Sequence, residues 1–271
     1  MSLNTDVEAL YQQLNENWSK SPPNLPKCGE TLKKLKIALT QLSFLPTKKT
    51  LSPISKKELL LARNVLEIGA QWSITERNLP SFERFMAQLK CYYYDYKNEL
   101  PPSALMNEML GLNLLFLLSQ NRLAEFHSEV ELLPRDESQN NIYLKHPISL
   151  EQYLMEGSYN KVFLAKGYVP APSYNFFMDI LLDTVRGEMA SCMQKAYYQI
   201  TFAEAQRMLN IKDDDAMKKF AKQLNWTTKK GTHFFDFSNV HKVDECGTGP
   251  LPAHELAKMA IEYAKELEMI V

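Results

Sequence analysis

The sequence predicts a mainly α-helical protein, in which a helical-repeat solenoid runs into a winged-helix domain and is followed by a C-terminal helix. Three observations support this fold class. Apolar residues recur at helical spacing through most of residues 1–198, a strand–helix–helix–hairpin order occupies residues 199–237, and an amphipathic segment follows a stretch that contains Gly and Pro. The expected parts are a solenoid at 1–172, a long helix and winged helix at 173–238, a linker at 239–252 and an assembly helix at 253–271.

Apolar stripes predict the helices of the first part in order. One stripe covers residues 7–18 and a second covers residues 32–42, and prolines follow both of them. Because proline does not continue a helix, these stripes are expected to belong to separate helices. Ser55 and Glu58 form a capping-box pattern ahead of a third stripe. Further helices are expected at 82–94, 105–118, 123–133 and 173–198, and no alternating strand pattern appears before Gln199.

A weak internal repeat links three of the expected turns. The segments ERNLPSF, SQNRLAEF and EGSYNKVF each follow an apolar stretch, and each places a polar turn ahead of an aromatic or aliphatic pair. Paired helices that recur at intervals of about 40 residues are typical of a degenerate helical solenoid. The alternative is that such turns recur by chance in any helical protein, and the repeat favours the solenoid.

The segment 199–237 predicts a winged helix. Thr201 is a good N-cap residue with Glu204 as its capping-box partner, and the acidic residues 213–215 suit the N-terminus of a second helix. The apolar face of the first helix is expected to be Ala205, Met208 and Leu209, and the second helix is expected to bury Met217, Phe220, Ala221 and Leu224. A hairpin at 227–237 follows, with Lys229 and Lys230 at its tip.

The sequence contains no recognisable catalytic, cofactor-binding or metal-binding motif, so we expect a protein that is not an enzyme and needs no cofactor. Its five histidines and four cysteines lie in no zinc-site spacing, and neither GxGxxG, GxxxxGK[ST] nor GxSxG occurs. The polar, acidic N-terminus does not resemble a signal or transit peptide, and no apolar run is long enough to span a bilayer. The cysteines are therefore expected to be reduced thiols of an intracellular protein.

The charge of the winged helix decides between nucleic-acid binding and protein binding. Lys218, Lys219 and Lys222 lie on the second helix, the position that enters the major groove in DNA-binding relatives of this fold. However, residues 199–237 hold seven Lys and Arg against five Asp and Glu, and the whole chain has a net charge of -1. Three of the aspartates crowd the start of that helix, so we favour a protein-binding module over a nucleic-acid reader.

Two surfaces are predicted to contact partner proteins. A hairpin leaves an edge strand that can pair with another chain, and alternation puts Phe235 and Phe237 on one face of the last strand and Phe234 on the other. The amphipathic terminal helix presents one apolar stripe, which needs a groove or partner helices. The predicted interface residues are Lys229, Lys230, Phe234, Phe235, Phe237, Leu256, Met259, Ala260, Tyr263, Leu267 and Ile270.

The segments SLEQYLMEGSYNKVFLAKGYVPAPSYNFFMDILLDTVRGEMASC, ITFAEAQRML and ELAKMAIEYAKELEMIV resemble the PCI family, and in particular its small proteasome-lid members. These proteins join TPR-like helical repeats to a winged helix. The resemblance implies a non-catalytic structural subunit of the lid of the 26S proteasome regulatory particle, which supports lid assembly and ATP- and ubiquitin-dependent degradation. It also implies a hetero-oligomer with other lid subunits, formed through the winged helix and a C-terminal helical bundle, in cytoplasm and nucleus and without membrane or nucleic acid. The alternatives are a small PCI scaffold subunit of the COP9 signalosome or of a translation initiation complex, and less favoured, a winged-helix nucleic-acid-binding protein.

Overall fold

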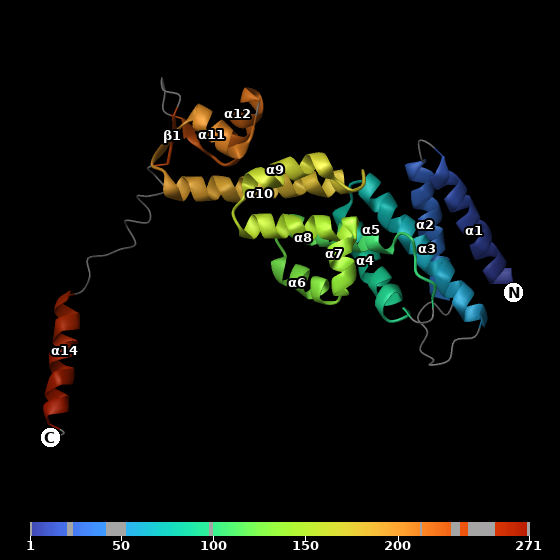
Figure 1. The fold of residues 1–271 in the computed structure, drawn as a ribbon, viewed down its shortest axis with the longest axis horizontal. Helices are drawn as coiled ribbons and strands as arrows, with labels where there is room; N and C mark the ends of the chain where they lie inside the picture. The colour runs from blue at the N-terminus through green and yellow to red at the C-terminus, as the bar shows by residue number, and fades with distance from the viewer. Residues whose placement is uncertain are drawn as a thin grey trace. The chain divides into compact units, whose positions relative to one another are not determined.

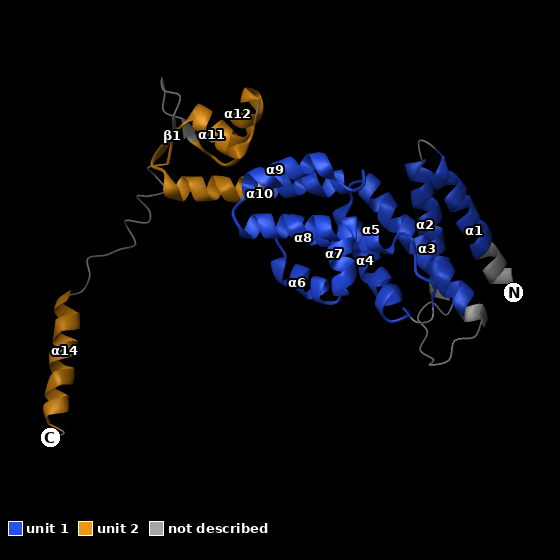
Figure 2. Cartoon of the chain, viewed as in Figure 1, with its two compact units in different colours: residues 1–184 blue, residues 185–271 orange. Residues whose placement is uncertain are grey.

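The computed structural model describes residues 2–20, 24–41, 53–97, 100–211, 213–228, 234–237 and 253–269. It is mainly α-helical, as the sequence predicts, and within these residues the first strand begins at Gln199 (Figure 1). The chain forms two compact units, residues 1–184 and residues 185–271 (Figure 2). The predicted linker at 239–252 and the hairpin tip at 229–233 lie outside the described residues.

The first unit is built from helices that pack as neighbouring pairs. Helix α1 packs on α2, α3 on α4, and α5 on both α6 and α8. Because connections within each of these regions are short, sequential helices fold back on one another and bury their apolar faces. The elements are α1 (Ser2–Ser19), α2 (Leu25–Gln41), α3 (Pro53–Thr75), α4 (Leu79–Tyr94), α5 (Met106–Ser119), α6 (Leu123–Glu131), α7 (Arg135–Asn140), α8 (Ile142–Met155), α9 (Tyr159–Ala165) and the 3-10 turn η1 (Lys166–Tyr168).

The three turns of the sequence repeat share one backbone geometry. Each has a residue at positive φ, namely Arg77 at 60°, Asn121 at 58° and Gly157 at 69°. At each of them the N–H of that residue donates to the carbonyl three residues earlier, and the next N–H donates to the carbonyl five residues before it. This pair of bonds is the Schellman motif, which satisfies the last carbonyls of a helix. The repeat therefore marks three helix ends with equivalent geometry.

Each repeated turn also places one apolar anchor in the core. Five residues after the positive-φ position lie Phe82, Phe126 and Val162, which are between 0% and 1% exposed. The Phe82 ring, for example, lies 5.6 Å from the Phe116 ring and 5.0 Å from the Phe177 ring. The apolar residue and the turn are thus two parts of a single local signal for a helical hairpin.

Helix α8 continues through a proline because a neighbouring helix replaces the lost hydrogen bond. Pro147 has no N–H, so the carbonyl of Tyr143, four residues earlier, loses its helical donor. The hydroxyl of Tyr174 donates to that carbonyl at 3.2 Å, and Tyr174 itself is 0% exposed. Gly111 of α5 lets the helices approach closely here, since a Cβ at this position would lie 2.5 Å from the same carbonyl oxygen. One buried cluster therefore joins α5, α8 and the helix α10 (Tyr174–Ala196).

Helix α10 (Tyr174–Ala196) is shared between the two units, whose boundary falls after Thr184. Its first half belongs to the core of the first unit, since the ring of Phe177 lies 5.0 Å from that of Phe82 and 6.0 Å from that of Phe116. The hydroxyl of Thr184 donates to the carbonyl of Ser119 at 3.0 Å. This division differs from the expected boundary at 172/173, because the apolar residues of the first half complete the solenoid.

The second unit contains the strand–helix–helix–hairpin order of a winged helix. Its elements after α10 are β1 (Gln199–Thr201), α11 (Phe202–Leu209), α12 (Asp214–Gln223), β2 (Thr227–Thr228), β3 (Phe234–Asp236) and α14 (Ala253–Glu268). The strands form an antiparallel sheet in the order β1-β3-β2. Strand β3 is therefore central, and β1 and β2 are the two edges of the sheet.

Candidate partner interface

Two capping devices fix the helices of the winged helix. The N–H of Glu204 donates to the hydroxyl of Thr201 at 3.2 Å, and that hydroxyl donates to the Glu204 carboxylate at 2.8 Å. The predicted N-cap and its partner are therefore present. Asn210, at φ 50°, ends α11 with the Schellman geometry of the first unit. The guanidinium of Arg186 donates to the carbonyl of Leu209 at 3.2 Å, where a cation also suits the helix C-terminus.

An aromatic cluster forms the core of the winged helix. The Trp226 ring lies 5.0 Å from the Phe235 ring and 5.0 Å from the Phe237 ring, in edge-to-face arrangements. Phe202 packs on Phe235 at 5.7 Å. Such pairs add about 0.5–1.5 kcal/mol to the burial of the rings. The cluster holds β3 against the helices that precede it.

The location of Phe235 and Phe237 corrects part of the predicted interface. They are 2% and 3% exposed, so they are core residues and offer no surface to a partner. Alternation does put them on one face, as predicted, but that face is filled by Trp226 and Phe202. Phe234 begins β3 and pairs with Thr201, while its side chain, like Lys229 and Lys230, lies outside the described residues.

The terminal helix α14 presents its apolar stripe to solvent. Leu256, Met259, Tyr263 and Leu267 are 49%, 58%, 66% and 49% exposed, and Ala260 is also exposed. Ile270 lies outside the described residues. No described residue of α14 is buried, although its apolar positions recur at steps of three and four. The structure brings these five predicted interface residues together on one helix.

The lysines of α12 do not form a strongly basic surface. Lys218 lies 3.6 Å from Asp215, and the first turn of the helix carries two acidic residues, Asp214 and Asp215. The end that would enter a DNA groove is therefore acidic, which opposes a phosphate backbone. This geometry agrees with the preference for protein partners.

The described residues contain no arrangement that would hold a metal ion. Among them, no group of three or more His, Cys, Asp or Glu side chains converges. Nor is any helix in this part of the chain long and apolar enough to cross a bilayer.

Sequence reasoning did not predict the apolar pocket that is lined by residues of α8, α9 and η1. Its rim carries the large exposed side chains of Ile142, Leu164 and Tyr168. The only sign of this pocket in the sequence was that the short helices carry apolar residues outside their buried stripe. That signal is weak, because single exposed apolar residues are common on protein surfaces.

A helical-repeat region that continues into a winged helix defines a PCI-type protein. Comparison of the sequence with known families gives a finer result, since residues 104–245 match the CSN8/PSMD8/EIF3K family, and the chain belongs to that family. Similar proteins include the 26S proteasome non-ATPase regulatory subunit 8 homolog A of Arabidopsis thaliana, 36% identical over 98% of both chains. The 26S proteasome non-ATPase regulatory subunit 8 of Caenorhabditis elegans is 32% identical, covering 98% of this chain and 100% of its own. The 26S proteasome regulatory subunit RPN12 of Saccharomyces cerevisiae is 30% identical, covering 90% of this chain and 92% of its own.

Proposed function

We propose that this chain is a non-catalytic structural subunit of the lid of the 26S proteasome regulatory particle. In this role it supports lid assembly and, through it, ATP- and ubiquitin-dependent protein degradation in cytoplasm and nucleus. The observation that carries the proposal is the length of the similarity. The three relatives described above are named as proteasome regulatory subunits, and each matches at least 90% of the chain. That span is long enough to include the helical repeats, the winged helix and the terminal helix together.

The exposed stripe of α14 supports an assembly role on physical grounds. Its larger side chains, Leu256, Met259, Tyr263 and Leu267, are about half exposed or more. Each contributes roughly 1.5–3 kcal/mol when it moves from water into an apolar environment. We infer that the stripe docks into a bundle formed with helices of other subunits.

The winged helix provides a second contact for the same assembly. Strand β2 is one edge of the sheet, and its unpaired backbone groups can accept a strand of a neighbouring chain. The contact would include Phe234 and the tip residues Lys229 and Lys230. Because the sheet edge and α14 are joined by the chain, binding at one raises the effective concentration of the other. Two modest contacts can therefore retain the subunit firmly.

The family match alone also allows the two related scaffolds, in the COP9 signalosome or a translation initiation complex. The names of the relatives that match most of the chain favour the proteasome. A nucleic-acid role is disfavoured by the acidic first turn of α12.

Native mass spectrometry of the tagged full chain, purified gently from its own cells, separates these possibilities. The chain should co-purify with proteasome regulatory subunits, and the intact particle should contain one copy of it. Recovery in a signalosome or an initiation complex, or as a free monomer, would contradict the proposal.

A further inference from the structure

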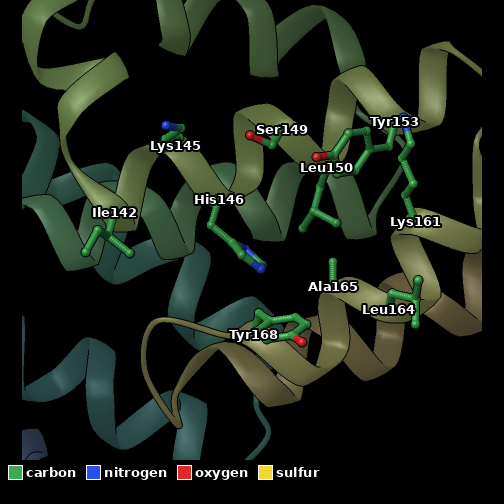
Figure 3. Close-up of a pocket in the computed structure, with 10 residues that line it drawn as sticks. All are labelled: Ile142, Lys145, His146, Ser149, Leu150, Tyr153, Lys161, Leu164, Ala165 and Tyr168. Atoms are coloured by element: carbon green, nitrogen blue, oxygen red, sulfur yellow. The ribbon is translucent and has the colours of Figure 1, made fainter.

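The pocket between α8 and α9 has an apolar interior and an open, apolar rim. Its volume is about 440 Å3, within the range of sites that bind ligands or anchor side chains. Figure 3 shows His146 and Leu150 extending from α8 toward Ala165 and Leu164 of α9, with Tyr168 beyond them. At the rim, Leu164 is 69% and Tyr168 84% exposed. Large apolar side chains that surround a hollow are typical of surfaces that bind proteins.

His146 forms part of the wall of the pocket. Both of its ring nitrogens are buried, so they are not exposed to an occupant of the pocket. Burial lowers the pKa of this imidazole, and a backbone hydrogen bond with Ala165 opposes that shift only in part. The ring therefore contributes shape rather than charge to the pocket.

The charged residues that line the pocket have one sign. They are Lys145 and Lys161, and no carboxylate of the described residues is part of the lining. Lys145 makes no ion pair with a described residue. Lys161 lies 3.7 Å from Glu156, but both side chains are about half exposed, and such pairs contribute little and exchange readily. Lys145 is therefore available to an anionic partner. Lys161, which also lies 5.0 Å from the centroid of the Tyr153 ring, can exchange its exposed pair with Glu156 for one.

We infer that this pocket binds an acidic peptide segment of another protein, through one bulky apolar side chain that enters between α8 and α9. The anchor packs on Leu150 and Leu164, beside the ring of His146. Carboxylates on either side of the anchor pair with Lys145 and Lys161. Charge complementarity selects an acidic rather than a basic segment. The residues on either side of the anchor contact the exposed rim of the pocket.

This inference goes beyond the proposed function and does not depend on it, because it concerns a surface of the first unit and can be tested on the purified full chain. The probe is a fluorescein-labelled peptide, DEEWLEDE, and binding is followed by fluorescence anisotropy. Two comparison peptides are DEEASEDE, which lacks the anchor, and KRRWLKRK, which reverses the charge. Hydrogen exchange with and without the probe then identifies the protected amides.

The full chain should bind DEEWLEDE saturably, with protection confined to residues 142–168, and should bind the two comparison peptides far more weakly. Leu164→Asp and the pair Lys145→Glu with Lys161→Glu should each weaken binding about tenfold or more. Leu164, Lys145 and Lys161 are exposed, so these variants should fold normally, which circular dichroism checks. The pair Lys33→Glu with Lys34→Glu, on exposed positions of α2, should change nothing.

Several results would overturn the inference. These are no saturable binding, equal binding of the basic or anchor-free peptide, or an equal loss in the Lys33 and Lys34 control. Preferential binding of a single-stranded oligonucleotide that depends on Lys145 and Lys161 would instead assign the pocket to nucleic acid.

Discussion

Replacing Gly111 by alanine should destabilise the first unit by about 1–3 kcal/mol, the usual cost of overpacking a core. Alanine is the better helix former, so propensity alone predicts the opposite sign. At this position, however, the new methyl would meet the Tyr174 hydroxyl and the Tyr143 carbonyl, 2.5 Å from the latter. The second obstacle is backbone and cannot rotate away. Thermal unfolding of the full chain, with hydrogen exchange in α5 and α8, measures the effect.

Gly187 provides the matched control. It also lies inside a helix, α10, but a Cβ there would have no atom within 4 Å. Gly187→Ala should therefore raise stability by roughly 0.5–1 kcal/mol through the lower backbone entropy of the unfolded chain. If both variants shift the stability in the same direction, close packing at Gly111 does not determine the stability of the contact between α5 and α8.

Phe235→Ala should cost about 3–5 kcal/mol, because the ring is fully enclosed and its loss leaves a cavity against Trp226 and Phe202. The loss is expected to be local to the winged helix. Faster amide exchange in β1, α11 and α12, with unchanged exchange in α4 and α5, would be the direct observation.

Phe220→Ala is the graded comparison for that variant. The sequence predicts Phe220 as a core residue, but it is only partly buried at the edge of the aromatic cluster, 6.5 Å from the Trp226 ring. Its truncation should therefore cost clearly less than that of Phe235. Equal losses of stability would mean that Phe235 on the central strand β3 contributes no more to this core than the partly buried Phe220 on α12.

Local signals allowed much of the fold to be predicted from the sequence. The capping pair Thr201 and Glu204 forms as expected, and the three repeated turns correspond to helix ends with one geometry. These features depend on residues within one turn of each other. At Ser55 the same reasoning was wrong, because α3 begins at Pro53 and so includes Ser55. Because proline suits the first position of a helix, α3 begins at Pro53, two residues before the predicted N-cap Ser55.

Features that depend on distant residues could not be predicted in this way. Pro147 argues against a helix at 142–155, and the Tyr174 hydroxyl, contributed by α10, bonds the carbonyl that the proline leaves without its helical donor. Helix α7 has the sequence RDESQN, which contains no apolar stripe to detect. The alternation of side chains along β3 was predicted correctly, but both faces of the strand carry aromatic residues, so the sequence did not indicate which face is buried. The buried face is the one on which Trp226 packs, and that contact could not be predicted from the local sequence.

The central claim is that the folded body and the docking helix are separate, and incorporation of α14 variants tests it most directly. Leu256→Asp with Tyr263→Asp places two charges seven residues apart on the apolar stripe. The control pair, Lys258→Asp with Lys265→Asp, introduces two aspartates at the same seven-residue spacing, but on the opposite face of α14. Each pair replaces the native chain in cells, and the copies per regulatory particle are counted by quantitative mass spectrometry.

The stripe variant should melt within a few degrees of the native chain, because the residues it changes are exposed. Two lost anchors should remove about 3–6 kcal/mol of docking energy, a weakening of more than about a hundredfold, so few particles should contain it. The control pair should be incorporated nearly as well as the native chain. Equal incorporation of the two pairs, or unfolding of the stripe variant on its own, would contradict the claim that α14 docks through its apolar stripe.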